Sequence, residues 1–544
     1  MSEIGPGTPQ EWVGAWSERR AALTPDREGL VDATTGERFT YAKLDQRANR
    51  TARLLRQYGV GTDDEASGTV AVVSRNRPAF VDLFFATGKT GCRLAPLSHR
   101  LAPPELAELL TRVDPDILVV EAPFAETVST ALETANELDP QILHLETTSD
   151  SASSVSTLDS TPYASALPED DSTVETATPA PGDTHLLLHT GGSTGTPKET
   201  KITHRGIIWN SLNTITAWGL RDDDVTPMVF PMFHTGGWNV LTVPLWHMGG
   251  TVVIAREFDP GDVLDTIDAE NGSILVAVPA ILRMMTEHDR WTETDLSTLR
   301  FAKSGGGPCR KSVMEAWWDR GVNLSQGYGL TECGPNNFAM PEEWAREKAD
   351  SVGKPALHVD ARVVDPDMSE AGDTGSRETV DTGTVGELQL RSPHAATGYL
   401  DNPEATAETF SEGWVSTGDL ARVDEDGYYY IEGRTKHMFV SGGENVYPAA
   451  VEDAIADHPS VAEVVVIPVP DDTWGQVGKA VIEPVSGVAT DNADAPLTLD
   501  SLREFLDGRL ARYKHPREMA FVEEMPTSGP DKIDRSTVSD RFGE

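Results

Sequence analysis

Short apolar runs alternate with helix-like segments in the first part of the chain, and this alternation limits the fold more than any other feature. Residues 70–73 and 116–120 are runs of mostly β-branched residues, which are typical of buried strands. Residues 44–55 and 80–88 carry apolar side chains at helical spacing. Strands that alternate with helices predict a largely parallel sheet with helices on both faces.

The rest of the chain predicts two further units. Its 544 residues leave room for roughly three or four structural units. Residues 383–430 place apolar residues among Gly and Asp turns, which indicates a β-rich subdomain. We therefore expect a large N-terminal domain of layered α/β subdomains plus a β-rich subdomain, residues 1–435. A small mobile α+β C-terminal domain, residues 436–544, follows it. Residues 146–183 are polar and predict a solvated, partly mobile surface excursion.

The charge balance excludes two classes of partner. The chain has 87 Asp and Glu against 45 Lys and Arg, for a net charge of −42. Such a surface repels nucleic acid and anionic membranes, and no basic run offsets it. The acids are spread along the whole chain, which we interpret as adaptation to a salt-loving (halophilic) organism. An ordinary acidic cytosolic protein is the alternative.

Cysteine usage and hydropathy predict a cytoplasmic protein. The three cysteines, Cys92, Cys309 and Cys333, are odd in number and form no CxxC pair. This argues against a disulfide framework or a zinc site and fits a reducing compartment. The first residues do not resemble a signal peptide, and no apolar run approaches the ~20 residues that span a bilayer.

Residues 189–198, with the sequence HTGGSTGTPK, carry the strongest local signal for chemistry. Glycines let the backbone approach a ligand closely, and successive N–H groups can surround phosphate oxygens. Thr190 and Ser193 add hydroxyl groups, and Lys198 adds a positive charge. The spacing differs from that of a Walker A loop, because Pro197 precedes the lysine. We predict a phosphate site, with a flexible Gly/Ser/Thr turn as the alternative.

A carboxylate in residues 327–332 indicates a metal site near this loop. Glu332 can hold Mg²⁺, which takes one or two carboxylates plus substrate phosphates. Tyr328 offers a ring that can stack on a purine. Alone, this short segment favours a strand and turn with an ordinary surface glutamate.

Two later segments carry weaker signals. Asp419 ends the sequence STGD and is followed by Arg434, and an aspartate here can accept hydrogen bonds from ribose hydroxyls. Lys532 ends a loop near the end of the sequence. Taken alone, a β-turn aspartate is the alternative for Asp419, and an exposed tail lysine is the favoured interpretation of Lys532.

In this order and spacing, these segments resemble the adenylate-forming superfamily, which includes acyl- and aryl-CoA synthetases, adenylation domains and beetle luciferases. The resemblance begins near residues 39–44 and ends at Lys532. It also covers residues 231–234, 304–308, 386–399, 433–436 and 442–445. It implies that ATP and a carboxylic acid form an acyl-adenylate and pyrophosphate, and that a thiol then takes the acyl group.

The resemblance also implies a role for individual residues. It assigns ATP binding to Thr190, Gly191, Gly192, Ser193, Thr194, Gly195, Lys198, Gly305, Gly306, Gly307, Pro308, Tyr328, Gly329, Asp419 and Arg434. The catalytic group comprises Thr331 near the α-phosphate, Glu332 as the Mg²⁺ ligand, the mobile Lys532 that assists adenylation, and His234 between the acyl pocket and the thiol tunnel. Lys436 matches the interdomain hinge. The residues that match the coenzyme A tunnel are Gly442, Gly443, Glu444 and Asn445. Those that match the acyl pocket are Trp238, Asn239 and Asn336.

Two positions depart from the family pattern. Glu199 and Asp531 replace glycines beside Lys198 and Lys532. We interpret both as part of an acid-enriched surface, and expect Glu199 to lie outside the phosphate cradle with little effect.

The acid and the thiol are predicted from the same resemblance. Residues 233–237 and 251–254 are most similar to fatty acyl-CoA synthetases of medium or long chain. An aryl-CoA ligase of the succinylbenzoate, coumarate or benzoate type is one alternative. A stand-alone adenylation enzyme that loads a carrier-protein thiol is another. The implied partners are the acid, ATP, Mg²⁺ and coenzyme A, with a homodimer possible because many relatives dimerise.

Overall fold

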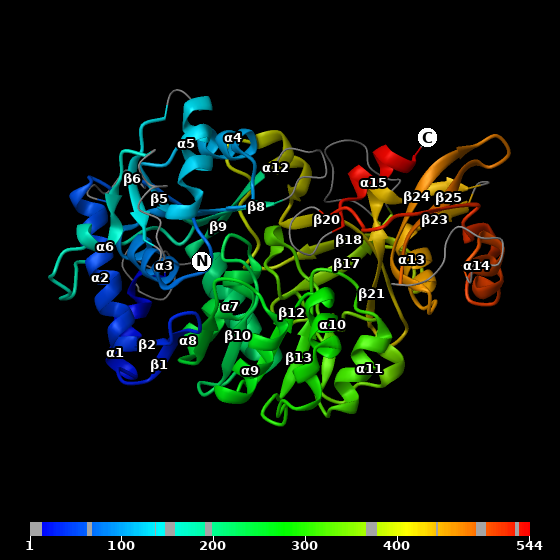
Figure 1. The fold of residues 1–544 in the computed structure, drawn as a ribbon, viewed down its shortest axis with the longest axis horizontal. Coiled ribbons are helices and arrows are strands. Elements are labelled where there is room, and N and C mark those ends of the chain that lie inside the picture. Colours follow the sequence, from blue (N-terminus) through cyan, green and yellow to red (C-terminus); the bar gives the residue numbers. More distant parts are fainter. Residues whose placement is uncertain are drawn as a thin grey trace.

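The computed structural model describes residues 13–61, 68–135, 138–146, 158–190, 198–365, 378–441, 444–485, 497–527 and 533–543. Figure 1 shows α/β units at one end, a β-rich unit in the middle and a C-terminal unit at the other end. The predicted fold class is confirmed by this arrangement.

A seven-stranded sheet forms the first unit. Its strand order is β7-β6-β5-β3-β4-β8-β9, and every pair is parallel except β8 with β9. The strands are β3 (Thr69–Val73), β4 (Arg93–Leu97), β5 (Ile117–Glu121), β6 (Gln141–Leu145), β7 (Thr161–Pro162), β8 (Thr184–Thr190) and β9 (Lys198–Thr203). Helices α2 (Tyr41–Gln57) and α3 (Pro78–Thr90) cover one face, and α4 (Pro103–Val113) and α5 (Ala125–Thr134) cover the other. The parallel sheet with helices on both faces is therefore confirmed.

Two smaller sheets continue the α/β part. One has the order β10-β11-β1-β2 and the other, all parallel, has the order β12-β13-β14. Their strands are β1 (Glu28–Asp32), β2 (Glu37–Thr40), β10 (Val225–Met228), β11 (Thr251–Ile254), β12 (Ile274–Ala277), β13 (Phe301–Ser304) and β14 (Leu324–Gln326). Their neighbouring helices are α1 (Trp16–Leu23), α7 (His204–Trp218), α8 (Thr242–Met248), α9 (Pro260–Ala269), α10 (Pro279–Glu287) and α11 (Lys311–Asp319).

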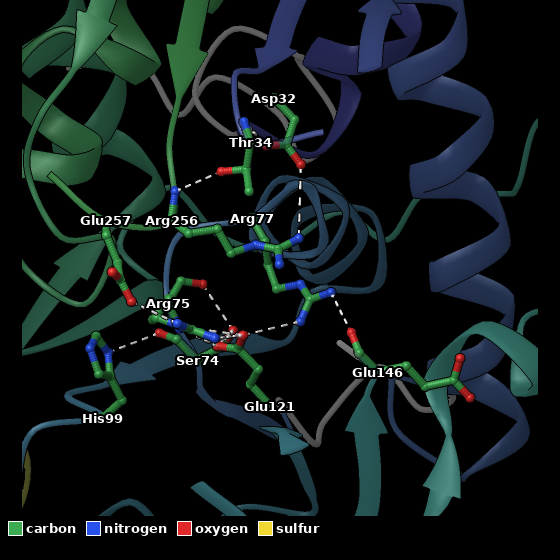
Figure 2. Close-up of polar contacts among 10 residues, drawn as sticks. All are labelled: Asp32, Thr34, Ser74, Arg75, Arg77, His99, Glu121, Glu146, Arg256 and Glu257. Atoms are coloured by element: carbon green, nitrogen blue, oxygen red, sulfur yellow. Dashed lines mark hydrogen bonds and ion pairs between the residues drawn. The ribbon is translucent and has the colours of Figure 1, made fainter. Parts of the chain in front are cut away.

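An arginine network joins the first two sheets at the carboxyl ends of their strands (Figure 2). Arg75 lies 2.8 Å from the fully buried carboxylate of Glu121, and Arg77 lies 3.7 Å from it. Across the sheets, Arg75 lies 2.7 Å from Glu257, which follows β11, and within the second sheet Arg256 lies 3.9 Å from Asp32. Burial alone would raise the pKa of Glu121, but the hydrogen bonds and charge of Arg75 outweigh burial and lower it. The Arg75–Glu257 pair therefore links the two sheets.

The β-rich unit is antiparallel, as predicted. Its strands are β17 (Asp360–Val364), β18 (Gly386–Arg391), β19 (Phe410–Ser411), β20 (Trp414–Val423) and β21 (Tyr429–Arg434), with α12 (Pro403–Thr409) beside them. In Figure 1 it lies, in yellow, between the first sheet and the C-terminal unit. Its central position lets it contribute residues to a site shared with the α/β part.

The C-terminal unit has its own sheet and two core clusters. It contains β22 (Phe439–Ser441), β23 (Glu444–Val446), β24 (Val461–Asp471), β25 (Gly475–Pro484) and β26 (Glu518–Phe521), with helices α13 (Pro448–Ala456), α14 (Leu499–Leu506) and α15 (Arg535–Phe542). Arg310 of the large unit donates to the Ala462 carbonyl at 2.5 Å, which joins the two units. The boundary between residues 435 and 436 stays a prediction.

The predicted surface excursion is confirmed for residues 158–183, of which only Tyr163 and Val174 are buried, although contacts with α2 hold the segment in place. The Tyr163 hydroxyl lies 2.8 Å from Thr51 Oγ1 on α2, and Arg50 of the same helix donates to the Pro168 carbonyl at 2.6 Å. Polar side chains of α2 hold this polar segment, which composition alone does not reveal. Residues 147–157 lie outside the described residues. In the described ranges no helix is long and apolar enough to cross a membrane.

Candidate active site

The predicted phosphate loop begins and ends at a strand pair. Thr190, the last residue of β8, is paired directly with Lys198, the first residue of β9. The Thr190 hydroxyl also donates to the Lys198 carbonyl at 3.4 Å. Gly191, Gly192, Ser193, Thr194 and Gly195 lie outside the described residues. The paired ends therefore fix where the loop begins and where its lysine emerges.

The structure brings Lys198 close to Glu332 through a tyrosine. Lys198 Nζ lies 5.0 Å from the centre of the Tyr399 ring. The Tyr399 hydroxyl donates to Glu332 Oε1 at 2.9 Å. The loop lysine and the predicted metal carboxylate therefore share one neighbour, although they come from distant parts of the sequence.

The residues around Glu332 fit Mg²⁺ bound together with nucleotide. Among the described residues, no group of three or more His, Cys, Asp and Glu side chains could hold a metal. A single carboxylate suits Mg²⁺, which commonly takes its other ligands from water and substrate phosphates. The predicted site thus needs ATP to complete it.

Asp419 is fixed from two sides in the β-rich unit. It lies opposite Arg434 in the β20–β21 pair, and Arg434 Nε is 2.6 Å from Asp419 Oδ1. The Tyr328 hydroxyl donates to Asp419 Oδ2. Burial, and then the charge of Asp419, raise the pKa of Tyr328 above its usual range, so the hydroxyl stays protonated. Tyr328, Asp419 and Arg434, the residues predicted to bind the nucleoside, are therefore in contact with one another through Asp419.

The glycine turns that follow β13 and β14 lie side by side. The Gly327 amide donates to the Ser304 carbonyl at 2.7 Å, immediately before Gly305. A Cβ atom at Gly329 would lie 2.0 Å from the Pro335 carbonyl oxygen, so no other residue fits there. Gly306, Gly307 and Pro308 are exposed, whereas Thr331 is buried. The predicted adenine wall is thus an open surface beside a closely packed turn.

Two of the three predicted acyl-pocket residues are in contact. The Asn336 side chain donates to the carbonyls of Asn239, at 3.2 Å, and Val240, at 2.9 Å. Asn239 and Val240 belong to a π-helix, η5 (Gly236–Val240), a rare element frequent at functional sites. Trp238 instead points into the core, where it stacks on Phe84 with ring centroids 5.1 Å apart. The assignment of these three residues to the acyl pocket stays a prediction.

The residues predicted for the second half-reaction are only partly described. His234 is exposed just before η5, and Lys436 is exposed in the short helix η10 (Thr435–His437), directly after β21. Glu444 is exposed in β23, where Asn445 pairs with Val440 through its backbone. Gly442, Gly443 and Lys532 lie outside the described residues. The roles predicted for all of them stay predictions.

Lys303 is a residue that the sequence prediction missed. Its side chain is buried in β13, where Nζ donates to Ser325 Oγ at 3.2 Å and lies 5.0 Å from the Trp218 ring centre. Burial lowers the pKa of Lys303 to about 8. The signal was a single lysine in an otherwise apolar strand just before the triple glycine.

A small apolar cavity lies on the same face of this sheet as Lys303. The cavity measures about 10 Å³ and is lined by Thr226, Pro227, Met228, Phe230, Gly236, Val240, Leu241 and Val276. Val276 and Lys303 are register partners on adjacent parallel strands, so their side chains share a face. Because Gly236 and Val240 belong to η5, the cavity borders the predicted acyl pocket, and Lys303 lies on the same face of the sheet as the cavity-lining Val276.

The prediction that Glu199 belongs to an acid-enriched surface is wrong, whereas its predicted place outside the phosphate cradle stays a prediction. Its side chain is fully buried in β9 and is not part of the acidic surface. Within the described residues neither carboxylate oxygen has a hydrogen-bond partner. Burial raises the pKa of Glu199 to about 7. The Leu400 amide donates to the Glu199 carbonyl at 2.8 Å, and this cover from the β-rich side is not visible in the local sequence.

Replacing Glu199 with glutamine is expected to make the protein more stable at alkaline pH. The pKa of Glu199 in the folded protein is about 7, above its ordinary value of 4.5. The free energy of unfolding of the wild type therefore falls as the pH rises from 4.5 to about 7, and stays constant at higher pH. This difference corresponds to about 3 kcal/mol. Denaturant unfolding at about pH 5 and about pH 8 should show the advantage of Glu199→Gln growing by that order. If the stability difference between Glu199→Gln and wild type is the same at both pH values, the raised pKa of the buried carboxylate is contradicted.

Sequence comparison identifies the family. The profile described as AMP-binding enzyme matches residues 17–400, and the AMP-binding enzyme C-terminal domain matches residues 450–532. The chain belongs to the AMP-binding enzyme family. It is an adenylate-forming ligase that joins an acid to a thiol.

Family members of known name act on different acids. The chain is 35% identical to the feruloyl-CoA synthase of Amycolatopsis sp, over 98% of this chain and 99% of that protein. It is 31% identical to the long-chain-fatty-acid–CoA ligase FadD13 of Mycobacterium tuberculosis, over 97% and 98%. The solved anthranilate CoA ligase AuaEII, in complex with anthranoyl-AMP, superposes with a TM-score of 0.85 at 25% identity, covering 98% of each chain. These AMP-binding enzymes share the fold and differ in substrate.

Proposed function

We propose that this AMP-binding enzyme converts an aryl carboxylic acid, ATP and coenzyme A into aryl-CoA, AMP and pyrophosphate through an enzyme-bound acyl-adenylate. The observation that carries the choice of acid is the buried Lys303 beside a small apolar cavity at the predicted acyl pocket. Two groupings support the nucleotide chemistry: Lys198 and Glu332 share Tyr399 as a neighbour, and Asp419 is held by Arg434 and Tyr328.

Adenylation joins two anions, so the protein must neutralise charge and hold an in-line geometry. Lys198 attracts the departing pyrophosphate, and Asp419, held by Arg434, accepts hydrogen bonds from the ribose. Lys532 stabilises charge that develops between the acid and the α-phosphate. Mg²⁺ held at Glu332 supplies further neutralisation of the phosphates. No protein nucleophile is required, because the acid itself attacks the α-phosphate.

Thioester formation needs a thiol near the acyl carbon after pyrophosphate leaves. The C-terminal unit follows η10, whose Lys436 is the proposed hinge. Rotation there would remove Lys532 and bring residues 442–445 to the tunnel, with His234 at its inner end. Free coenzyme A is the proposed thiol, since the relatives named above are CoA ligases or synthases.

An aryl acid with a polar ring substituent suits Lys303 better than an alkyl chain. In the part of the chain that the structure describes, Lys303 Nζ has one hydrogen bond, to Ser325 Oγ, and no ion pair. A buried ammonium group is costly unless it is paired or hydrogen-bonded. A ring hydroxyl or methoxy oxygen offers it an acceptor, which a fatty chain lacks. A fatty acid is the second candidate, because FadD13 is similar over nearly the whole chain.

Replacing Lys303 with methionine should show whether the substrate is an aryl acid or a fatty acid. For hydroxylated aryl acids kcat/KM is expected to fall about 10- to 100-fold, the effect of losing a hydrogen bond to a charged group. For unsubstituted aryl acids it should change by less than about three-fold. Pyrophosphate release with hydroxycinnamates, cinnamate, benzoate and fatty acids from octanoate to palmitate measures this.

Lys311→Met, at an exposed position on α11, is the matched control and should leave every acid unaffected. An equal loss for all acids would contradict a specific role of Lys303. A wild-type preference for palmitate over every aryl acid would favour the fatty-acid candidate.

The cytoplasm is the proposed location. All three cysteines, Cys92, Cys309 and Cys333, are buried and free, which suits a reducing compartment. A homodimer stays a prediction.

A further inference from the structure

Residues 396–400, which we call the connecting segment, join the phosphate-loop strand to the turn that carries Glu332. The Ala396 amide donates to the Glu332 carbonyl at 2.9 Å. The Lys201 amide, on β9, donates to the Gly398 carbonyl at 2.9 Å. The segment is therefore bonded to both halves of the predicted metal-nucleotide site.

Tyr399 is the side chain of this segment that reaches the site. It is 6% exposed, and its ring packs edge-on against Phe410 with centroids 5.7 Å apart. Its hydroxyl donates to Glu332, and Lys198 lies over its ring. Burial, and then the charge of Glu332, raise the pKa of Tyr399, so the hydroxyl remains a donor at neutral pH.

This arrangement holds two opposite charges near each other without joining them. Among the described residues, neither Lys198 nor Glu332 forms an ion pair. A direct Lys–Glu pair would neutralise both groups and withdraw them from the phosphates and the metal. A ring face holds the ammonium group by a cation–π contact, and a hydroxyl holds one carboxylate oxygen, so both charges stay available.

We propose that Tyr399 is a positioning residue that keeps Lys198 and Glu332 apart and oriented, so that both act on the same magnesium–nucleotide complex. The proposal rests on the function proposed above and adds a residue to it. A purely structural tyrosine would instead contribute only its packed ring. The hydroxyl distinguishes the two roles, because packing does not need it.

Tyr399→Phe removes the hydroxyl and keeps the ring. We expect it to weaken ATP binding in the presence of Mg²⁺ about ten-fold, the effect of one hydrogen bond to a charged group, and to leave binding in EDTA unchanged. Tyr399→Leu, which also removes the ring, should weaken ATP binding under both conditions. Isothermal titration calorimetry without acid or coenzyme A measures this directly, and no turnover is needed.

Tyr430→Phe is the matched control. It removes a tyrosine hydroxyl that donates to a carboxylate, Asp424, at 3.0 Å in the same β-rich unit. We expect it to bind ATP like wild type with and without Mg²⁺. Circular dichroism and thermal unfolding establish that each variant is folded.

A double-variant comparison keeps the test valid if Tyr399→Phe is less stable. In a Glu332→Gln background, Tyr399→Phe should have no further effect on binding with Mg²⁺, because the hydroxyl acts through that carboxylate. A further ten-fold loss there would overturn the proposal.

The outcomes separate this inference from the proposed function. An equal loss with and without Mg²⁺, or no loss at all, overturns the role of Tyr399 while wild type still binds ATP. Folded wild type that binds no ATP under either condition overturns both.

Discussion

Replacing Lys532 with alanine is expected to slow acyl-adenylate formation by about 100-fold or more, the usual effect of removing one group that stabilises transition-state charge. Thioester formation from supplied acyl-AMP should stay within about three-fold of wild type, because the proposed hinge rotation withdraws the lysine in that step. Pyrophosphate exchange measures the first half-reaction. Rapid-quench analysis of acyl-AMP and coenzyme A measures the second.

Lys514→Ala provides the control for this variant. Lys514 lies in the same C-terminal unit, in a short helix at Arg512–Lys514. It should leave both half-reactions near wild type. Equal losses in both half-reactions for Lys532→Ala would contradict a role confined to adenylation.

Replacing Asp419 with asparagine is expected to raise the KM for ATP about 10- to 100-fold, with a smaller effect on the KM for the acid. The carboxylate is 5% exposed and fixed by Arg434 and Tyr328, so its charge is oriented toward one place. Losing a charge-assisted hydrogen bond in such a site costs about 1.5–3 kcal/mol. Steady-state kinetics with ATP and acid varied separately measures both constants.

Asp360→Asn makes the same change in an exposed pair. Asp360 lies 2.7 Å from Arg391, and both side chains are more than half exposed. Exposed ion pairs contribute little, so this variant should match wild type. If Asp419→Asn also matched wild type, the ribose assignment would be wrong.

The helices and strands could be predicted from the sequence because each hydrophobic pattern lies within a single helix or strand. The apolar run at 70–73 became β3, and the helical segment at 80–88 became part of α3. Asp419 and Arg434 meet because β20 and β21 are neighbouring antiparallel strands, close in the sequence. The ends of the phosphate loop were likewise fixed by the adjacent pair β8 and β9.

The residues that the sequence did not reveal depend on contacts between distant segments. Glu199 is buried in β9, whose backbone pairs with residues 396–400 from the β-rich side, and a departure from a motif does not reveal that pairing. Lys303 lies on the same sheet face as the cavity-lining Val276 because of their register, and a shift of one residue would move it to the other face. Tyr399 contacts Lys198 and Glu332 only after the β-rich unit packs on the first sheet.

We propose above that this AMP-binding enzyme activates an acid with ATP and transfers the acyl group to coenzyme A. This proposal can be tested in one experiment. It is tested most directly by measuring pyrophosphate release and acyl-CoA formation by the wild-type protein. Concentrated KCl suits the net charge of −42. We expect release that requires an acid and Mg²⁺, is fastest with hydroxylated aryl acids, and increases with coenzyme A as aryl-CoA appears. Folded protein that binds ATP but releases no pyrophosphate with any aryl or fatty acid, with or without coenzyme A, would contradict the account.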